Sequence, residues 1–157
     1  MSFNLMEMVK GAISEKTAAG MASVLGTDQP SGEKAADLAL PALIGGLLKK
    51  SSTVSGASEL FGMLDVFDGS QLEELDDAFD GGAKQDDWLS GGKGILETIF
   101  GGNLSAIVGK VAKTTGMDSS TVGKLFSMLA PLVMGVLGKQ KQEAGWDIGN
   151  FTSVMAE

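Results

Sequence analysis

Apolar residues recur along this chain at helical spacing. The segment Ala18–Leu25 carries apolar residues at i, i+3, i+4 and i+7, and Val108–Thr115 repeats the spacing with a threonine at its last position. This spacing is typical of the buried face of an α-helix. Two further runs, Leu38–Leu48 and Met128–Gly138, each contain eleven residues without a charge. Because a membrane-spanning helix needs about 20 apolar residues, we expect both runs to be helices buried in a soluble core.

Glycine and aspartate mark the boundary between the second and third predicted helices in both parts of the chain. Gly26 and Gly116 follow the second helix, at the position where a left-handed residue ends a helix. Asp28 and Asp118 lie two residues further on, where a side-chain oxygen can accept hydrogen bonds from the first backbone N–H groups of the third helix. We therefore predict that these four residues have structural roles at helix ends.

Proline and glycine also occupy matched positions inside the third helix. Pro41 and Pro131 fall about three turns into it, where a proline removes one backbone hydrogen bond and crowds the carbonyl four residues earlier. We expect a kink or a break at each proline. Gly45 and Gly135 lie one turn further on and would let a neighbouring helix approach closely. The two proline-bearing segments are the predicted centre of the core.

These matched signals belong to an internal repeat. Shifting the sequence by 90 residues aligns Leu5–Phe67 with Ile95–Glu157 without a gap, and eleven positions are identical. This composition would give about five identities by chance. The fold class we predict is all-α, a multihelical array of short helices built from two tandem, internally duplicated halves. The predicted organisation is a single all-helical domain over residues 1–157, with a first repeat over 3–67, an acidic linker containing a short helix over 68–92, and a second repeat over 93–157.

The outer helices of each half are predicted from shorter signals. Asn4 and Glu7 have the spacing of a capping box in the first copy, and Gly94–Glu97 opens the equivalent helix in the second. Fourth helices are predicted near Ser55–Val66 and Gly145–Met155. Each predicted half therefore contains four helices.

The segment between the halves is strongly acidic. Asp65–Asp87 contains nine acids and one lysine, which equals the net charge of −8 of the whole chain. Ser70–Glu73 has the spacing of a capping box, so we predict an acidic amphipathic helix that ends near Phe79, after which Gly91–Gly92 leads into the second half. Acids four residues apart on such a helix could bind a cation, but the EF-hand spacing is not met. We favour a solvated acidic face and predict no metal site.

Missing residue types exclude most kinds of catalysis. The chain has no cysteine, histidine or arginine, so it has no thiolate nucleophile, no imidazole base and no zinc site of nitrogen and sulfur ligands. Its net charge of −8 makes nucleic acid an unfavourable partner. We therefore predict no catalytic residue, no cofactor and no enzymatic activity. An enzyme that uses carboxylates alone is a third hypothesis, and it would require a pocket with two inward-facing acids.

The N-terminal residues carry no export signal of the usual kind. Met1–Lys10 has no positive cluster followed by an apolar stretch, so a signal peptide is not predicted. The sequence also lacks a basic amphipathic helix, which would bind the surface of an anionic bilayer. We expect a cytoplasmic protein.

The sequences around the two prolines resemble those of a known family. Leu40–Leu47 reads LPALIGGL and Leu129–Gln140 reads LAPLVMGVLGKQ. Both resemble sequences of an uncharacterised bacterial domain-of-unknown-function family. This family is similar to the YidB-like proteins. The resemblance covers most of the chain outside the acidic linker. It implies an all-helical bacterial domain and no established activity. Members often have a glycine-rich middle, whereas this chain is acidic there.

Two hypotheses for the function follow from these observations. The first is a non-enzymatic helical interaction or self-association module that forms a homo-oligomer or binds a protein partner, because apolar surface left over by a duplicated fold favours dimerisation. The alternative is a carrier or sensor of an apolar ligand, a lipid or a membrane surface. A mean hydropathy of +0.16 in so acidic a protein is compatible with an apolar cavity.

Overall fold

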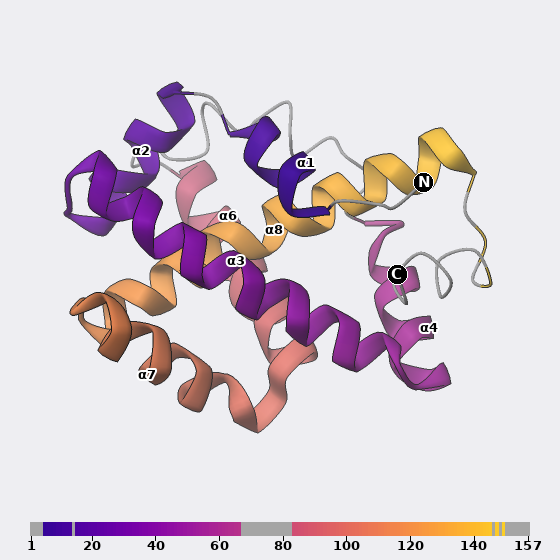
Figure 1. Cartoon of the computed structure of the whole chain (residues 1–157). Helices are drawn as coiled ribbons and strands as arrows, with labels where there is room; N and C mark the ends of the chain where they lie inside the picture. The colour runs from indigo at the N-terminus through magenta and orange to yellow at the C-terminus, as the bar shows by residue number, and fades with distance from the viewer. Residues whose placement is uncertain (1–4, 14, 67–82, 146, 148, 150–157) are drawn as a thin grey trace.

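The helical spacing corresponds to eight helical elements in a computed structural model that describes residues 5–13, 15–66, 83–145, 147 and 149. Figure 1 shows these elements packed as a multihelical array. No β-strand occurs among the described residues, so the all-α prediction is confirmed. The elements are α1 (Leu5–Ala12), α2 (Glu15–Leu25), α3 (Gln29–Ser51), α4 (Val54–Met63), α6 (Ala83–Phe100), the 3₁₀-helix η2 (Gly101–Asn103), α7 (Leu104–Thr115) and α8 (Ser119–Ala144).

The apolar run of α8 forms the centre of the core. Every residue from Met128 to Gly138 is buried, and α1, α2, α3, α6 and α7 all pack against this helix. In Figure 1, α8 passes behind α3. A helix surrounded on all sides needs apolar residues around its whole circumference, and this run supplies them. The prediction that this segment lies at the centre of the core is confirmed.

The equivalent run of α3 is buried on one side only. Leu40, Leu43 and Leu47 face the core and are at most 1% exposed. The opposite side of the helix is open, because Pro41 and Gly45 are exposed there. The prediction that both proline-bearing helices lie at the centre is therefore wrong for α3, which is an amphipathic outer helix.

Neither proline ends its helix. The helix α3 is continuous over 23 residues with Pro41 inside it, and α8 is continuous over 26 residues with Pro131 inside it. The break that the sequence allowed does not occur. A proline costs a helix one backbone hydrogen bond but leaves the turns on either side intact, and groups outside the helix can satisfy the carbonyl that it leaves.

The helix α6 packs closely against α8 beside Pro131. This proline has no N–H to donate to the carbonyl of Ser127. Gly92 lies directly against that carbonyl, since a Cβ atom built on Gly92 would be 1.9 Å from the Ser127 oxygen. One turn earlier in α6, the indole N–H of Trp88 donates a hydrogen bond of 2.8 Å to the carbonyl oxygen of Met128. Trp88 and Gly92 therefore fit α6 onto the part of α8 that the proline opens.

The start of α6 differs from the prediction. The helix is continuous from Ala83 to Phe100, so Gly91–Gly92 does not connect two segments and no helix opens at Gly94. Both predictions are wrong because glycines are poor helix formers in isolation, whereas here the close approach of α8 requires one of them. The predicted helix over Ser70–Phe79 and the predicted cap at Asn4 lie outside the described residues.

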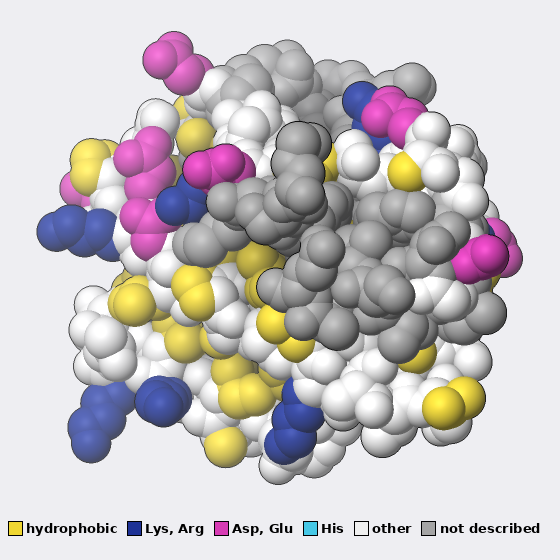
Figure 2. All heavy atoms as spheres, turned by 45° about the vertical axis from the view of Figure 1, so that its right-hand side comes forward, with side chains coloured by type: hydrophobic (Ala, Val, Ile, Leu, Met, Phe, Trp, Pro, Cys, Tyr) yellow, Lys and Arg dark blue, Asp and Glu magenta, His cyan; other side chains and the backbone are white. Residues whose placement is uncertain are grey.

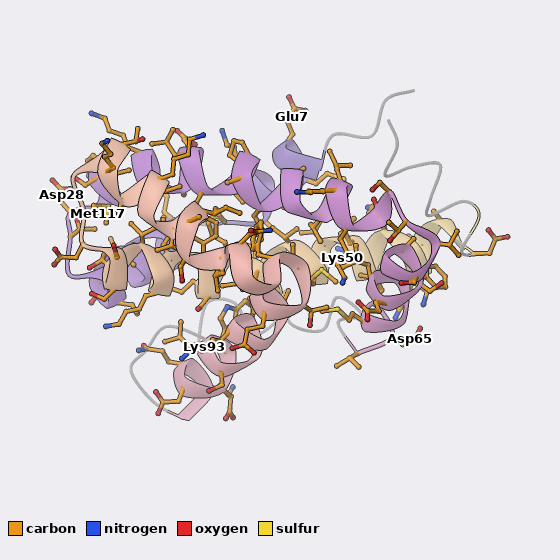
Figure 3. The ribbon with its side chains drawn as sticks, turned by 90° about the horizontal axis from the view of Figure 1, so that it is seen from below. Glu7, Asp28, Lys50, Asp65, Lys93 and Met117 are labelled. Carbon is orange, nitrogen blue, oxygen red and sulfur yellow. The ribbon has the colours of Figure 1, made fainter. Side chains whose placement is uncertain are left out.

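The predicted helix ends between the second and third helices of each half are confirmed. Gly26 and Gly116 are left-handed, with φ of 70° and 75°. Asp28 and Asp118 are the N-caps of α3 and α8, and both have extended backbone. Figure 3 shows Asp28 and Met117 at the same end of the molecule, so both turns lie together there. The ends of α2 and α7, and the starts of α3 and α8, agree with the 90-residue shift, while the duplication itself stays a prediction.

The fourth helices have different outcomes. The helix α4 covers Val54–Met63, close to the predicted range of Ser55–Val66. Gly145, the predicted first residue of the other fourth helix, is instead the left-handed C-cap of α8, with φ of 66°. That helix therefore does not begin at Gly145, and residues 150–157 lie outside the described part of the chain.

Candidate binding groove

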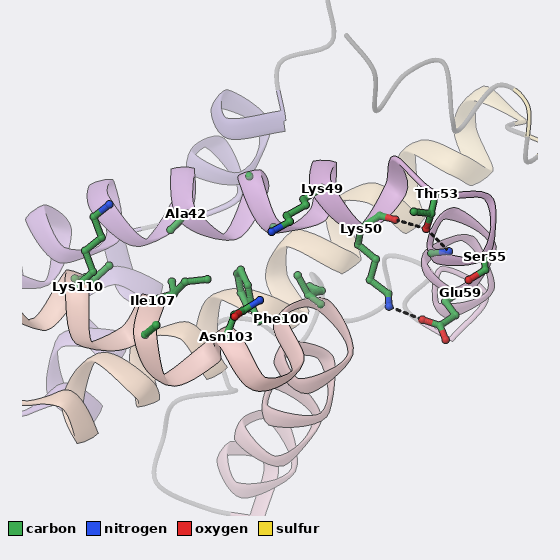
Figure 4. A pocket seen from close by; sticks show the side chains of 16 residues that line it. Ala42, Lys49, Lys50, Thr53, Ser55, Glu59, Phe100, Asn103, Ile107 and Lys110 are labelled. Atoms are coloured by element: carbon green, nitrogen blue, oxygen red, sulfur yellow. Dashed lines mark hydrogen bonds and ion pairs between the residues drawn. The ribbon is translucent and has the colours of Figure 1, made fainter.

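A groove with a volume of about 790 Å³ runs along α3 on the side of α7. Figure 4 shows α3 forming one wall and α7 the other, while the start of α4 closes one end. The C-terminal turn of α6 and the 3₁₀-helix η2 lie beneath it, with Phe100 and Asn103 among the lining residues. The groove is therefore built where the two halves of the chain meet.

The floor of the groove is apolar and rigidly supported. Ile107 and Phe100 lie between the two walls in Figure 4. The Phe100 ring packs edge-on against the buried Phe126 of α8, with ring centroids 6.4 Å apart and an interplanar angle of 87°. Gly46 lets α3 lie on this ring, because a Cβ atom on Gly46 would be 2.3 Å from Phe100 Cε1. The floor is thus fixed to the central helix of the core.

Lysines line the edge of the groove. Lys49 reaches over it from α3, and Lys110 reaches toward α3 from α7 (Figure 4). Lys50 lies near the closed end, where its Nζ is 2.6 Å from Glu59 Oε2 of α4. Within the described part of the chain, Lys49 and Lys110 make no ion pair. The groove therefore combines an apolar floor with two positive charges that a ligand can neutralise.

The chemistry of the groove is suited to binding. Glu59 is the one carboxylate among its described lining residues, and the ion pair with Lys50 holds it at the closed end. The described residues contain no group of three or more acids that could hold a metal ion. Apolar side chains with a few placed charges are typical of ligand and peptide sites.

A second surface adjoins the groove, and we call it the outer face of α3. It consists of Leu38, Pro41, Gly45 and Leu48, which follow one another at helical spacing. Leu38 and Leu48 are each 41% exposed, and Gly45 also lines the groove. Figure 2 shows apolar side chains open to solvent left of centre in the lower half of the molecule, with lysines beside them.

The predicted structural residues occupy several different places in the fold. Gly26, Asp28, Gly116 and Asp118 lie at helix ends, and Pro131 and Gly135 are buried in α8. Of the eight, Gly45 alone lines the groove. Sequence reasoning missed Lys49, Ile107 and Lys110. Lys49 directly follows an apolar run, and this is a signal that could have identified it. The approach of α7 to α3 depends on contacts between distant parts of the chain, so Ile107 and Lys110 carry no such local signal.

Two long apolar segments also meet the length and composition of a membrane span. These are the stretch Lys84–Thr115 and the helix Ser119–Ala144. In the second, 83% of the most apolar window is buried inside the fold, against 39% in the first. The burial of α8 inside the fold accounts for its apolar composition.

The architecture defines an all-helical protein with a central apolar helix and an open groove on its surface. Residues 7–140 match a family described as bacterial protein of unknown function (DUF937), and the chain belongs to this family. The resemblance to an uncharacterised bacterial family is thus confirmed at that level. No curated protein and no solved structure shows a significant match.

Proposed function

We propose that the protein is a non-enzymatic helical interaction module, whose groove binds an amphipathic helix of a partner protein. The observation that carries this proposal is the combination of an apolar floor with Lys49 and Lys110 at its edge. Helices bind in apolar grooves through residues at i, i+3, i+4 and i+7. The two lysines select a helix with carboxylates beside its apolar stripe and would also speed its approach.

A charge reversal on α7 tests this proposal. Lys110→Glu changes the groove, whereas Lys113→Glu changes the same kind of side chain on the same helix outside the groove lining. A photo-reactive residue at Ile107 captures the partner from cells, and mass spectrometry locates the linked segment. We expect a linked acidic amphipathic segment with the native chain and with K113E, and loss of the link with K110E. Equal capture by both charge variants would refute the proposal.

The alternative function is a carrier of an apolar ligand with an anionic head group. It is favoured by the volume of the groove, about 790 Å³, which lies within the range of about 300 to 1,000 Å³ typical of small-molecule sites. In this case the tail would lie on Phe100 and the head would contact Lys110. Titration with dodecanoate, followed by calorimetry, distinguishes the two. Saturable binding that K110E weakens, together with no linked protein at Ile107, would favour the carrier.

A further inference from the structure

We infer that the outer face of α3 is the contact surface of a homodimer, in which the α3 helices of two copies cross antiparallel. This inference goes beyond the proposed function, because it concerns Leu38, Pro41, Gly45 and Leu48 and assigns them a second copy of this chain as partner. The two surfaces adjoin, because Gly45 and Lys49 also line the groove.

The chain itself contains a covered version of this surface. A shift of 90 residues carries the outer face of α3 onto Met128, Pro131, Gly135 and Gly138 of α8, and all four of these are buried. On α8 the proline does not stand in water, because Gly92 of α6 packs on the Ser127 carbonyl. The surface of α8 that corresponds to the outer face of α3 is therefore covered within the fold.

Among the described residues, nothing covers the same surface of α3 in this way. Trp88 and Gly92 lie in the N-terminal part of α6, before the residues that align with α1. The helix α6 has 18 residues and α1 has eight, so no residue of α1 corresponds to Trp88 or Gly92. A Cβ atom built on Gly45 would meet nothing within 4 Å. Pro41 has no N–H for the carbonyl of Asp37. Two partly exposed leucines, an open glycine and an exposed proline thus share one side of α3.

The order of residues on this side makes it self-complementary. When two antiparallel copies of α3 cross at the level of residue 43, positions equally far from that residue lie at the same level. Leu38 of one copy is then level with Leu48 of the other, and Pro41 is level with Gly45. A C₂ interface requires such a match of one patch with itself. The small Gly45 lets the helix axes approach closely at the crossing.

The charges at the edge of the face have the same symmetry. Asp37 of one copy is level with Lys49 of the other, so the two-fold axis brings opposite charges to the same level twice. Within one copy, Asp37 contacts Lys10 of α1, with Nζ and Oδ1 3.1 Å apart. Like charges at the same level would oppose this crossing, and the sequence of α3 avoids them there. A second copy therefore matches the order of residues on this face and brings no like charges to the same level.

Sedimentation of the full chain tests the dimer. Leu48→Glu places a charge in the interface, and we expect the dissociation constant to rise at least about tenfold. Val54→Glu is the matched control, because Val54 is 87% exposed on α4 and lies outside the face. Circular dichroism checks that both variants keep the helical content of the native chain. A native chain that sediments as a monomer at every concentration would overturn the inference, and so would equal weakening by both variants.

Cysteine cross-linking tests the antiparallel geometry in particular. The chain has no cysteine, so single variants can be compared without background. Pro41→Cys places two thiols about 6 Å apart along the axis of an antiparallel pair, whereas Ser52→Cys places them about 27 Å apart. We expect a short bis-maleimide to link P41C and not S52C. Linking of both would indicate parallel helices and would overturn the arrangement, as would linking of neither.

This test is also independent of the proposed function. Lys110 lies on α7 and outside the outer face, so K110E should dimerise as the native chain does. A dimer that persists in K110E, with loss of capture at Ile107, would confirm both statements separately. Loss of the dimer in K110E would show that the groove, and not the outer face, joins the copies, and would overturn the inference alone.

Discussion

The helices α3 and α8 carry the same landmarks but have opposite surroundings. Each begins one residue after an aspartate and has its proline at the thirteenth position, followed four residues later by glycine. In α8 the proline and the glycine are buried, whereas in α3 both are exposed. The positions of proline and glycine within a helix therefore do not decide how deeply the helix is buried. It depends on which other helices reach it.

The helix that makes the difference is α6. Its first ten residues have no described counterpart before α1, and they contain both Trp88 and Gly92. These two residues contact backbone oxygens of α8 next to Pro131. The indole N–H of Trp88 donates to the Met128 carbonyl, and Gly92 allows α6 to pack closely on the Ser127 carbonyl, so α6 covers the part of α8 that contains Pro131. Pro41 needs no such helix because water reaches it.

The largest expected contrast comes from truncating matched side chains. Met128 is 0% exposed, and its counterpart Leu38 is 41% exposed. We expect Met128→Ala to lower the free energy of unfolding by about 2 to 5 kcal/mol, because it leaves a cavity in the core. Leu38→Ala should cost less than about 1 kcal/mol in the monomer. Urea unfolding at low protein concentration measures both, and equal losses would contradict the difference in burial.

Adjacent glycines of α6 give the next contrast. Gly92→Ala forces a methyl group against the Ser127 backbone, and overpacking of this kind costs about 1 to 3 kcal/mol. Gly91→Ala meets nothing within 4 Å and should stabilise the helix by up to about 1 kcal/mol. Thermal unfolding of the two variants compares them directly. The same sign of change in both would mean that α6 does not approach α8 as closely as described.

Removing the indole N–H should have a smaller effect. Trp88→Phe keeps most of the ring but takes the donor from the Met128 carbonyl, which is buried. We expect a loss of about 1 to 2 kcal/mol in the free energy of unfolding. Leu89→Phe, one residue further along α6, changes a partly buried side chain without removing a hydrogen bond to α8 and serves as the control. An unchanged stability in W88F would show that water replaces the indole.

Local signals predicted much of the fold, while long-range contacts account for what was missed. The left-handed Gly26 and Gly116 and the N-caps Asp28 and Asp118 follow from backbone chemistry within a few residues, and the structure has them where they were expected. The continuity of α6 did not follow, because Gly91 and Gly92 favour a break until α8 is placed against them. The groove was not predicted either, since Ile107 and Lys110 face α3 only after the chain has folded.

The two N-caps provide the finest comparison between the halves. Asp28 Oδ1 accepts a hydrogen bond of 3.0 Å from the backbone N–H of Ser31, whereas the side chain of Asp118 makes no capping hydrogen bond in α8. Hydrogen bonds from the Ser31 side chain, and next from its backbone N–H, lower the pKa of Asp28 below the ordinary value of an aspartate. A pKa that is lower in the folded state contributes stability above the unfolded-state pKa, and that stability is lost as the pH falls through the folded value.

We therefore expect acid to weaken the start of α3 through Asp28. Asp28→Asn keeps an acceptor for the cap but removes the titration, so its stability should fall less between pH 5 and pH 2 than that of the native chain. Asp118→Asn is the matched control at the start of α8, where no capping bond is lost. Urea midpoints measured across this pH range supply the comparison. An identical acid dependence in D28N and D118N would mean that the charge on Asp28 does not stabilise α3, and that the two helix starts are alike in energy as well as in sequence.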